Sequence, residues 1–194
     1  MRRMPSRGPT GASQGFAPVS GPGAAVLVLG SLPGRLSLER QQYYGQPRNA
    51  FWPILATLTG AAASASYDER LRRLVAVGIA LWDVCAAAER PGSLDASIRA
   101  DSVVPNDFAA FFARHSAIGL VCFNGATAAA LYRRRVLGAL PEGCRSLPQL
   151  ILPSTSPAHA ALSLEAKRLR WHAALVPRLT GAPHATRDAA KRPA

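Results

Sequence analysis

AVLVLGSLPGRLSLERQQYYGQPRNAFW, residues 25–52, joins an apolar run to a polar loop and then to a segment that looks helical. The run from Ala25 to Leu29 is wholly aliphatic, and it stops at Gly30. An aliphatic run without alternation predicts a strand buried on both faces, as in the middle of a parallel sheet. Ligands of open α/β sheets bind beyond the carboxyl ends of the strands, so we expect a site in the loop that follows Gly30.

Predicted strands and helices alternate along the rest of the chain. Further strands are expected at 79–84, 118–123 and 150–152, and helices at 49–60, 66–77, 126–136 and 163–176, with another beginning near 105–107. Ser66 and Glu69 have the spacing of a capping box, which indicates the start of a helix. This alternation predicts a three-layer α/β/α sandwich with a central, mainly parallel four-stranded sheet. The polar turns that follow three of the strands should then meet at one edge of that sheet.

The two ends of the chain differ in composition from its middle. Residues 1–22 are rich in Gly, Pro, Ser and Arg, and we expect a disordered basic arm there. Residues 181–194 are expected to form a disordered basic tail. Residues 23–180 should form one domain, because 48% of the 194 residues are hydrophobic and can build a core without disulfides or metals.

The charge of the chain favours a polyanionic partner. It has 23 Lys and Arg against 11 Asp and Glu, a formal net charge of +12, and its only lysines are Lys167 and Lys191. Arginines bind phosphates and release counterions, which is typical of nucleic-acid binding. The same excess of basic residues could instead reflect a generally arginine-rich composition together with the basic ends of the chain.

The cysteines and the apolar runs argue against a metal-binding, membrane-spanning or secreted protein. Cys85, Cys122 and Cys144 show no CxxC spacing and are expected to be reduced, buried thiols, so no metal site is predicted. No stretch is apolar enough to span a bilayer, and no apolar segment follows the N-terminal arginines. We therefore expect a cytoplasmic protein without a membrane contact.

The polar turns offer amides and hydroxyls rather than a catalytic acid–base pair. They contain Asn49, Asn124 and the hydroxyls of residues 154–156, and no Ser/His/Asp pattern emerges. GSLPG also lacks the spacing of a dinucleotide fingerprint and the Lys of a phosphate-binding P-loop. Asn can hold a water and donate a hydrogen bond to a departing group, which suits cleavage of an N-glycosidic bond.

Three motifs in one order carry a resemblance to a known family. GSLPG…QQYYGQPRNAFW, CFNG at 122–125 and LPSTSPAHA at 152–160 resemble the hypoxanthine-DNA (deoxyinosine) glycosylases, a branch of the uracil-DNA glycosylase superfamily. The resemblance implies the fold of that superfamily and a monofunctional enzyme that hydrolyses hypoxanthine, and other deaminated bases, from DNA. It implies no metal or cofactor, DNA as the partner, and a monomer in the bacterial cytoplasm that acts at the nucleoid.

The resemblance also implies roles for individual residues. Asn49 matches the catalytic Asn of the family's P-R-N-x-F-W segment, whereas Leu32 stands where mismatch-specific members carry a water-holding Asn. The implied base-binding residues are Gly30, Ser31, Leu32, Tyr44, Asn124 and Phe51, whose ring would stack on the extruded base. The residues implied for phosphate contact, or for the wedge that fills the vacated stack, are Ser154, Thr155, Ser156 and His159. The family positions without an assigned role are Asp83, Arg90, Ser93 and Asp95.

Plainer interpretations stay open for several of these residues. Asn49 precedes a predicted helix and could be its N-cap, and Asn124 could belong to an ordinary Asn-Gly turn. Tyr43, Tyr44 and Trp52 could be core aromatics, which is the interpretation we favour for Trp52. Residues 154–156 could simply begin a helix, and His159 could be a surface residue.

Two other functions fit parts of the sequence. A uracil or mismatch glycosylase of the same fold would share these motifs, because sequence does not measure the volume of a base pocket. A non-catalytic nucleic-acid-binding α/β module would explain the charge and the hydroxyl-rich turns, but not the presence of all three motifs.

Overall fold

The computed structural model describes residues 11–92 and 94–179. Its centre is a four-stranded sheet in the order β3-β2-β6-β7, and every neighbouring pair is parallel. The strands are β2 (Val26–Gly30), β3 (Ile79–Asp83), β6 (Leu120–Asn124) and β7 (Gln149–Leu152). The predicted parallel sheet and its four strands are confirmed.

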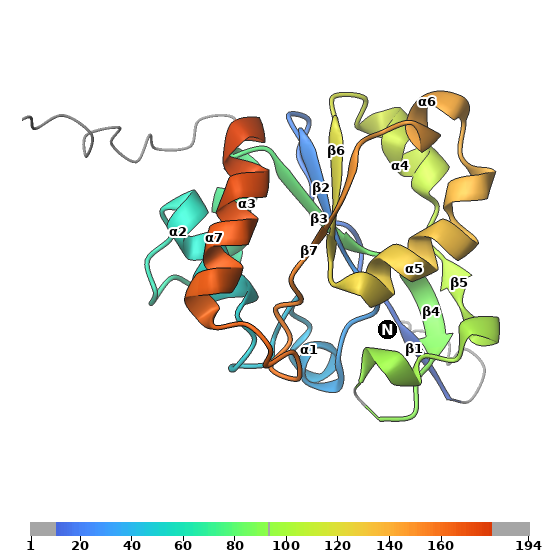
Figure 1. Ribbon diagram of the computed structural model, residues 1–194, viewed down its shortest axis with the longest axis horizontal. Helices are drawn as coiled ribbons and strands as arrows, with labels where there is room; N and C mark the ends of the chain where they lie inside the picture. Colours follow the sequence, from blue (N-terminus) through green and yellow to red (C-terminus); the bar gives the residue numbers. More distant parts are fainter. Residues whose placement is uncertain (1–10, 93, 180–194) are drawn as a thin grey trace, which may run out of the picture.

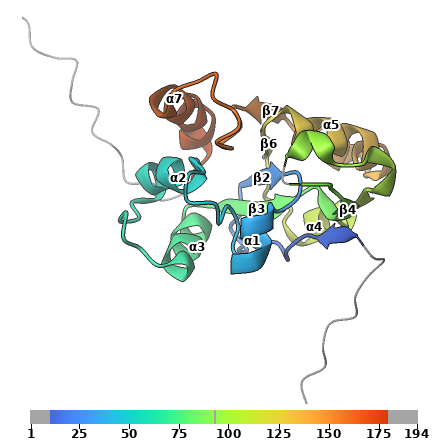
Figure 2. The ribbon, with the colours of Figure 1, turned by 90° about the horizontal axis from the view of Figure 1, so that it is seen from below.

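Helices cover both faces of this sheet, as Figures 1 and 2 show from two directions. On one face lie α2 (Phe51–Thr59), α3 (Tyr67–Ala76) and α7 (Leu164–Leu175). On the other lie α4 (Phe108–Arg114) and α5 (Ala126–Arg135), followed by the short α6 (Glu142–Arg145). The predicted α/β/α sandwich is therefore confirmed, although the loop after β2 contains an additional helix, α1 (Arg35–Arg40).

The sheet divides the core into two halves. Leu27 and Leu29 belong to the half under α4 and α5, whereas Val26 and Val28 belong to the half under α2, α3 and α7. Side chains of a strand alternate between faces, so a strand with a core on each side must be apolar at every position. Full burial of one such side chain stabilises the fold by roughly 1.5–3 kcal/mol.

Three helices begin where a polar side chain caps them. The Ser66 hydroxyl accepts a hydrogen bond from the backbone N–H of Glu69 at 3.2 Å, which confirms the predicted start of α3. Asp107 caps α4 in the same way, and Ser163 caps α7. Such caps typically contribute about 1 kcal/mol each.

The predicted disordered arm is wrong for the part that the structure describes. Residues 11–22 include β1 (Ala12–Gln14), which pairs antiparallel with β4 (Cys85–Glu89), and β4 pairs in turn with β5 (Val104–Pro105) in a second small sheet. The backbone of Val19 also exchanges hydrogen bonds with Leu81. Two apolar residues, Phe16 and Val19, thus anchor a segment whose composition alone predicts disorder. Residues 1–10 and 181–194, the rest of the predicted arm and the tail, lie outside the described residues.

The described helices include none with the length and apolar character that crossing a membrane requires.

Candidate active site

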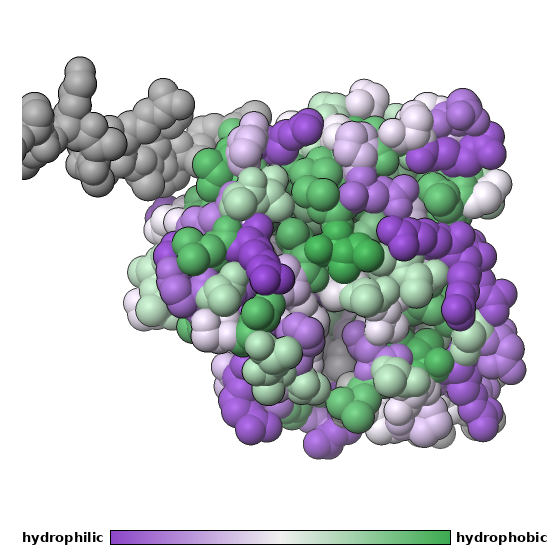
Figure 3. Space-filling view, in the orientation of Figure 1, coloured by the Kyte–Doolittle hydropathy of each residue, from purple (hydrophilic) through white to green (hydrophobic). Residues whose placement is uncertain are grey.

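The carboxyl ends of the parallel strands open into a cavity of about 1130 Å³, and the three predicted polar turns meet there. Figure 3 shows this face of the molecule hollowed below its apolar centre. The predicted site residues that line the cavity are Gly30, Ser31, Leu32, Tyr44, Asn49, Asn124, Ser154, Thr155, Ser156 and His159. Parallel topology places these sequence-distant residues together, as expected from the positions of the turns.

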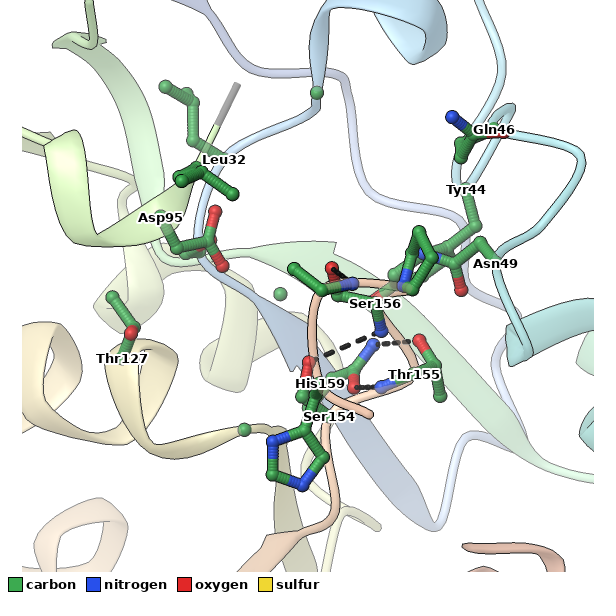
Figure 4. Close-up of a pocket in the computed structure, with 18 of the residues that line it drawn as sticks. Leu32, Tyr44, Gln46, Asn49, Asp95, Thr127, Ser154, Thr155, Ser156 and His159 are labelled. Atoms are coloured by element: carbon green, nitrogen blue, oxygen red, sulfur yellow. Dashed lines mark hydrogen bonds between the residues drawn. The ribbon is translucent and has the colours of Figure 1, made fainter. Parts of the chain in front are cut away.

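The labelled side chains reach the cavity from three sides (Figure 4). Leu32 and Asp95 lie on one side, and Tyr44 and Asn49 lie on the opposite side. The segment after β7, with Ser156 and its neighbours, runs between them. A ligand in the cavity would therefore touch all three turns at once.

Asn49 lies directly before the N-cap of α2, Ala50, and lines the cavity. Its Oδ1 accepts a hydrogen bond from the backbone N–H of Phe51 at 3.0 Å, so the N-terminal turn of α2 uses this side chain. The next backbone N–H, of Ala50, donates to the carbonyl of Thr155 at 3.0 Å. Within the described part of the chain, no hydrogen bond engages Nδ2 of Asn49. The N-cap interpretation of Asn49 is therefore wrong, because Ala50 holds that position without a side-chain cap. The Oδ1 of Asn49 makes a local turn to Phe51, and the Nδ2 end of the same amide is left for a ligand.

Phe51 does not reach the cavity, so the prediction that its ring stacks on an extruded base is wrong. The side chain has no exposed surface. The ring of Tyr44 lies over it, with centroids 3.8 Å apart and an interplanar angle of 18°. Trp52 and Trp171 meet the Phe51 ring edge-on. Phe51 and Trp52 are therefore core residues, which confirms the interpretation that we favoured for Trp52.

Tyr44 is the aromatic ring that lines the cavity in place of Phe51. Its φ of 54° is left-handed, which is uncommon for a residue other than glycine. The hydroxyl is buried without a hydrogen-bond partner among the described residues. Burial, and then the nearby carboxyl of Asp83, raise the pKa of Tyr44, so its hydroxyl is a neutral donor at physiological pH. Backbone strain and an unpaired polar group at a cavity are typical of functional positions.

Asn124 and Thr155 form a closed pair between the end of β6 and the loop after β7. Nδ2 of Asn124 donates to the Thr155 hydroxyl at 2.8 Å, and the backbone N–H of Thr155 donates to Oδ1 of Asn124 at 2.8 Å. Thr155 is 1% exposed, so the prediction that its hydroxyl contacts phosphate is wrong. Asn124 lines the cavity, but its amide already serves this pair.

Ser154 and Ser156 shape the same loop while remaining half-buried in the cavity wall. The Ser154 hydroxyl accepts from the backbone N–H of Ser156 at 3.3 Å, and the Ser156 hydroxyl accepts from that of Ala158 at 3.2 Å. These are local turns rather than the start of a helix, since α7 begins at Leu164. Both hydroxyls can still donate to a ligand.

Helix α7 holds the segment that carries His159. Nζ of Lys167 donates to the His159 carbonyl at 2.7 Å, and Nε1 of Trp171 donates to the Pro153 carbonyl at 2.9 Å. The His159 side chain is half-buried and lines the cavity. The loop is thus fixed at both of its ends by one helix.

Two family positions without a sequence-based role hold the GSLPG turn. Arg90 is buried, and its guanidinium donates to the carbonyls of Leu32 and Pro33. The same guanidinium lies 3.7 Å from the carboxyl of Asp95. Burial raises the pKa of Asp95, while the Ser31 hydroxyl and Arg90 lower it. Leu32 itself is 5% exposed and packs into the core beside the cavity that it lines.

Sequence reasoning left Asp83 without a role and missed three arginines of the cavity. Asp83, the last residue of β3, is buried in the wall. Arg35, Arg48 and Arg170 are exposed at the rim, where cations attract phosphates. The position of Asp83 at a strand end could have signalled the first, whereas the arginines are indistinguishable in sequence from the other surface arginines. No group of three or more potential metal-ligating side chains occurs in residues 11–92 and 94–179.

Comparisons with known proteins agree with this architecture. The chain is 40% identical to a hypoxanthine DNA glycosylase of Methanosarcina barkeri and 37% identical to one of Methanosarcina acetivorans, in each case over 113 residues that cover 58% of this chain and 70% of the relative. The solution NMR structure of a "putative Uracil DNA glycosylase" from Methanosarcina acetivorans superposes with a TM-score of 0.69 at 32% identity, covering 84% of this chain and 95% of that one. The family model of the Uracil DNA glycosylase superfamily matches residues 17–180. The resemblance of the three motifs is therefore confirmed, and the chain belongs to the uracil-DNA glycosylase superfamily.

Proposed function

We propose that this protein is a monofunctional DNA glycosylase that hydrolyses the N-glycosidic bond of deoxyinosine and releases hypoxanthine. The two relatives named hypoxanthine DNA glycosylase support this substrate. The observation that carries the proposal is one cavity that holds both the unengaged amide donor of Asn49 and the ring of Tyr44. At about 1130 Å³ the cavity exceeds the roughly 300–1000 Å³ of typical small-molecule pockets, so a purine with its sugar can enter.

Base extrusion is the first step that the site must support. The glycosidic bond cannot be reached inside the stack, and extrusion costs a few kcal/mol. The ring of Tyr44 offers a stacking surface, and the Phe51 ring beneath it holds it in place. Stacking on an aromatic side chain contributes about 1–3 kcal/mol per base, which offsets much of that cost.

Hydrolysis of the glycosidic bond of the extruded nucleotide is the second step. A water attacks C1′ of the sugar, the bond to the base nitrogen breaks, and the base leaves with that electron pair and takes up the proton that the water releases. Nδ2 of Asn49 would donate a hydrogen bond to the water or the departing nucleotide, an interaction that strengthens as charge develops. The described residues that line the cavity include no lysine, so a Schiff base and strand cleavage by β-elimination are not expected. The products would be an abasic site and free hypoxanthine.

The rim supplies the contacts to the DNA backbone. Arg35, Arg48 and Arg170 surround the cavity, and Arg35 is also paired with Glu39 at 2.9 Å. The hydroxyls of Ser154 and Ser156 lie in the wall between the rim and the floor. Phosphates on either side of an extruded nucleotide would meet these groups, which position the strand without reading its sequence.

Single-turnover excision with variants of Asn49 tests the proposal. Asn49→Ala removes the oxygen that accepts from the Phe51 N–H and should lose about 0.5–1.5 kcal/mol of unfolding free energy. It also removes the amide donor at the cavity and should slow excision by about two to three orders of magnitude. Asn49→Asp keeps the oxygen that accepts from Phe51 but removes the amide donor, so it should restore stability and leave excision slow. Normal excision by a folded Asn49→Ala would overturn the catalytic role.

The substrate is tested with oligonucleotides that carry one deoxyinosine, deoxyuridine or deoxyxanthosine, with alkaline cleavage of the resulting abasic sites. We expect the fastest excision from deoxyinosine. Excision from deoxyuridine alone would replace this proposal with the uracil-specific alternative. Binding to all three oligonucleotides without excision would indicate a non-catalytic DNA-binding protein.

A further inference from the structure

Asp83 places a buried carboxyl in the wall of the cavity, and one of its two oxygens has no hydrogen-bond partner among the described residues. It ends β3 and is the register partner of Gly30 in β2. The residue is 4% exposed and lines the cavity, and its Oδ2 is buried without a hydrogen-bond partner among the described residues. A buried, unpaired carboxyl oxygen is costly, so a native protein that keeps one has a use for it.

Gly30 is the residue that makes room for this carboxyl. A Cβ on Gly30 would stand 2.3 Å from Oδ1 of Asp83 and 3.2 Å from the hydroxyl of Tyr44. Any side chain at position 30 would therefore displace both groups. The glycine that ends β2 serves the placement of Asp83 and Tyr44, and not only a close approach of backbone to a ligand.

The groups around Asp83 favour its neutral form. Asp95 faces it from the segment after β4, Arg90 from the same connection, Cys85 from the start of β4, and Tyr43 and Tyr44 from the loop before α2. The guanidinium of Arg90 is already committed to two backbone carbonyls of the GSLPG turn. Burial, with the like charge of Asp95, raises the pKa of Asp83 to about 8, and Arg90 opposes this only in part. Asp83 is therefore mainly a carboxylic acid at pH 7.

We propose that Asp83 is a specificity-determining residue that contacts the extruded base as a neutral carboxylic acid, which rests on the proposed glycosylase function. A neutral carboxyl presents one O–H donor beside one C=O acceptor, whereas a carboxylate presents acceptors only. The lactam edge of hypoxanthine presents a C=O acceptor beside an N–H donor. The two edges are complementary while Asp83 is protonated, and the bond from the acid to the base oxygen is lost when Asp83 ionises. A buried Asp kept protonated as a donor is a known device of enzyme sites.

The test compares single-turnover excision of deoxyinosine between pH 6 and pH 10 for the wild type, Asp83→Asn and Asp101→Asn. Asp83→Asn keeps a donor beside an acceptor and cannot ionise, so its rate should not follow the ionisation of Asp83. From pH 7 to pH 9 the wild-type rate should fall about tenfold relative to Asp83→Asn, because the neutral fraction of an acid with a pKa near 8 falls by that factor. Ionisation of the substrate affects both proteins alike and cancels in the ratio.

Asp101→Asn is the matched control, since it removes an exposed carboxyl outside the cavity and should follow the wild-type profile. A constant ratio of wild-type to Asp83→Asn rates across the pH range would overturn the proposal. So would an Asp83→Asn that is folded, by its melting curve, and inactive at every pH, because that result indicates a base or an ionised role. A wild type that excises no base at any pH would instead refute the proposed function itself.

A second measurement keeps the proposal falsifiable if Asp83→Asn does not fold. Carbon-13 NMR of the Asp83 carboxyl in the wild type reports its ionisation directly. Binding of abasic DNA together with hypoxanthine should raise the apparent pKa of Asp83 above its value with abasic DNA alone, because the base binds the neutral acid. An unchanged or lowered pKa in the presence of hypoxanthine would overturn the proposal.

Discussion

Substitution of Phe51 separates a core role from a base-stacking role. Phe51 is completely buried between Tyr44, Trp52 and Trp171. Replacing a fully buried Phe with Ala removes its transfer free energy and leaves a cavity, which costs about 3–5 kcal/mol. Domains typically unfold with 5–15 kcal/mol, so Phe51→Ala should fold but lose a large share of its stability. Urea unfolding, followed by tryptophan fluorescence, measures this loss.

A milder variant of Phe51 tests function with a smaller loss of stability. Phe51→Leu keeps an apolar side chain beneath Tyr44 and should lose only about 1–2 kcal/mol. Its single-turnover excision of deoxyinosine should stay within a few-fold of the wild type, because the base stacks on Tyr44 and not on Phe51. Tyr44→Ala should slow excision by about ten- to a hundredfold, the equivalent of 1–3 kcal/mol of lost stacking.

The opposite pattern would refute this reasoning. It consists of a Phe51→Leu protein with unchanged unfolding free energy and a hundredfold loss of excision, together with normal excision by Tyr44→Ala. Such a result would show that the Tyr44 ring moves aside and exposes Phe51 to the base.

Two other predictions concern the loop pair and the rim. Thr155→Val leaves Nδ2 of Asn124 without its buried acceptor and should lower the free energy of unfolding by about 1–3 kcal/mol, measured in urea. Thr155→Ser keeps the acceptor and should keep most of the stability. Equal stability of the two variants would contradict the role of the pair. The binding constant for DNA should fall as salt rises, with a slope of several units in a plot of its logarithm against the logarithm of the salt concentration. Arg48→Gln and Arg170→Gln should each reduce that slope by about one. A binding constant that does not depend on salt would exclude phosphate contacts at the rim.

Local sequence pattern was sufficient for the order and type of most elements. The uninterrupted aliphatic run of β2, the Ser66 cap of α3 and the turns after β2, β6 and β7 all depend on neighbours within a few residues. Because parallel strands bring their carboxyl ends to one edge, these local features also predicted where the site would be. The motif resemblance added ten of the residues that line it.

Packing between distant segments decided what the local pattern could not. Phe51 and Tyr44 are both aromatic residues in one polar motif, and only the docking of α2 against α7 buries the first beneath the second. Residues 11–22 read as disordered because their partners, β4 and Leu81, lie about 70 residues away in the chain. Asp83 looks like any polar strand end until Gly30 is seen beside it in the neighbouring strand. Burial and pairing depend on contacts across the whole chain, so the exposure of a ring, the protonation of an acid and the order of a terminal segment follow from tertiary structure and not from periodicity.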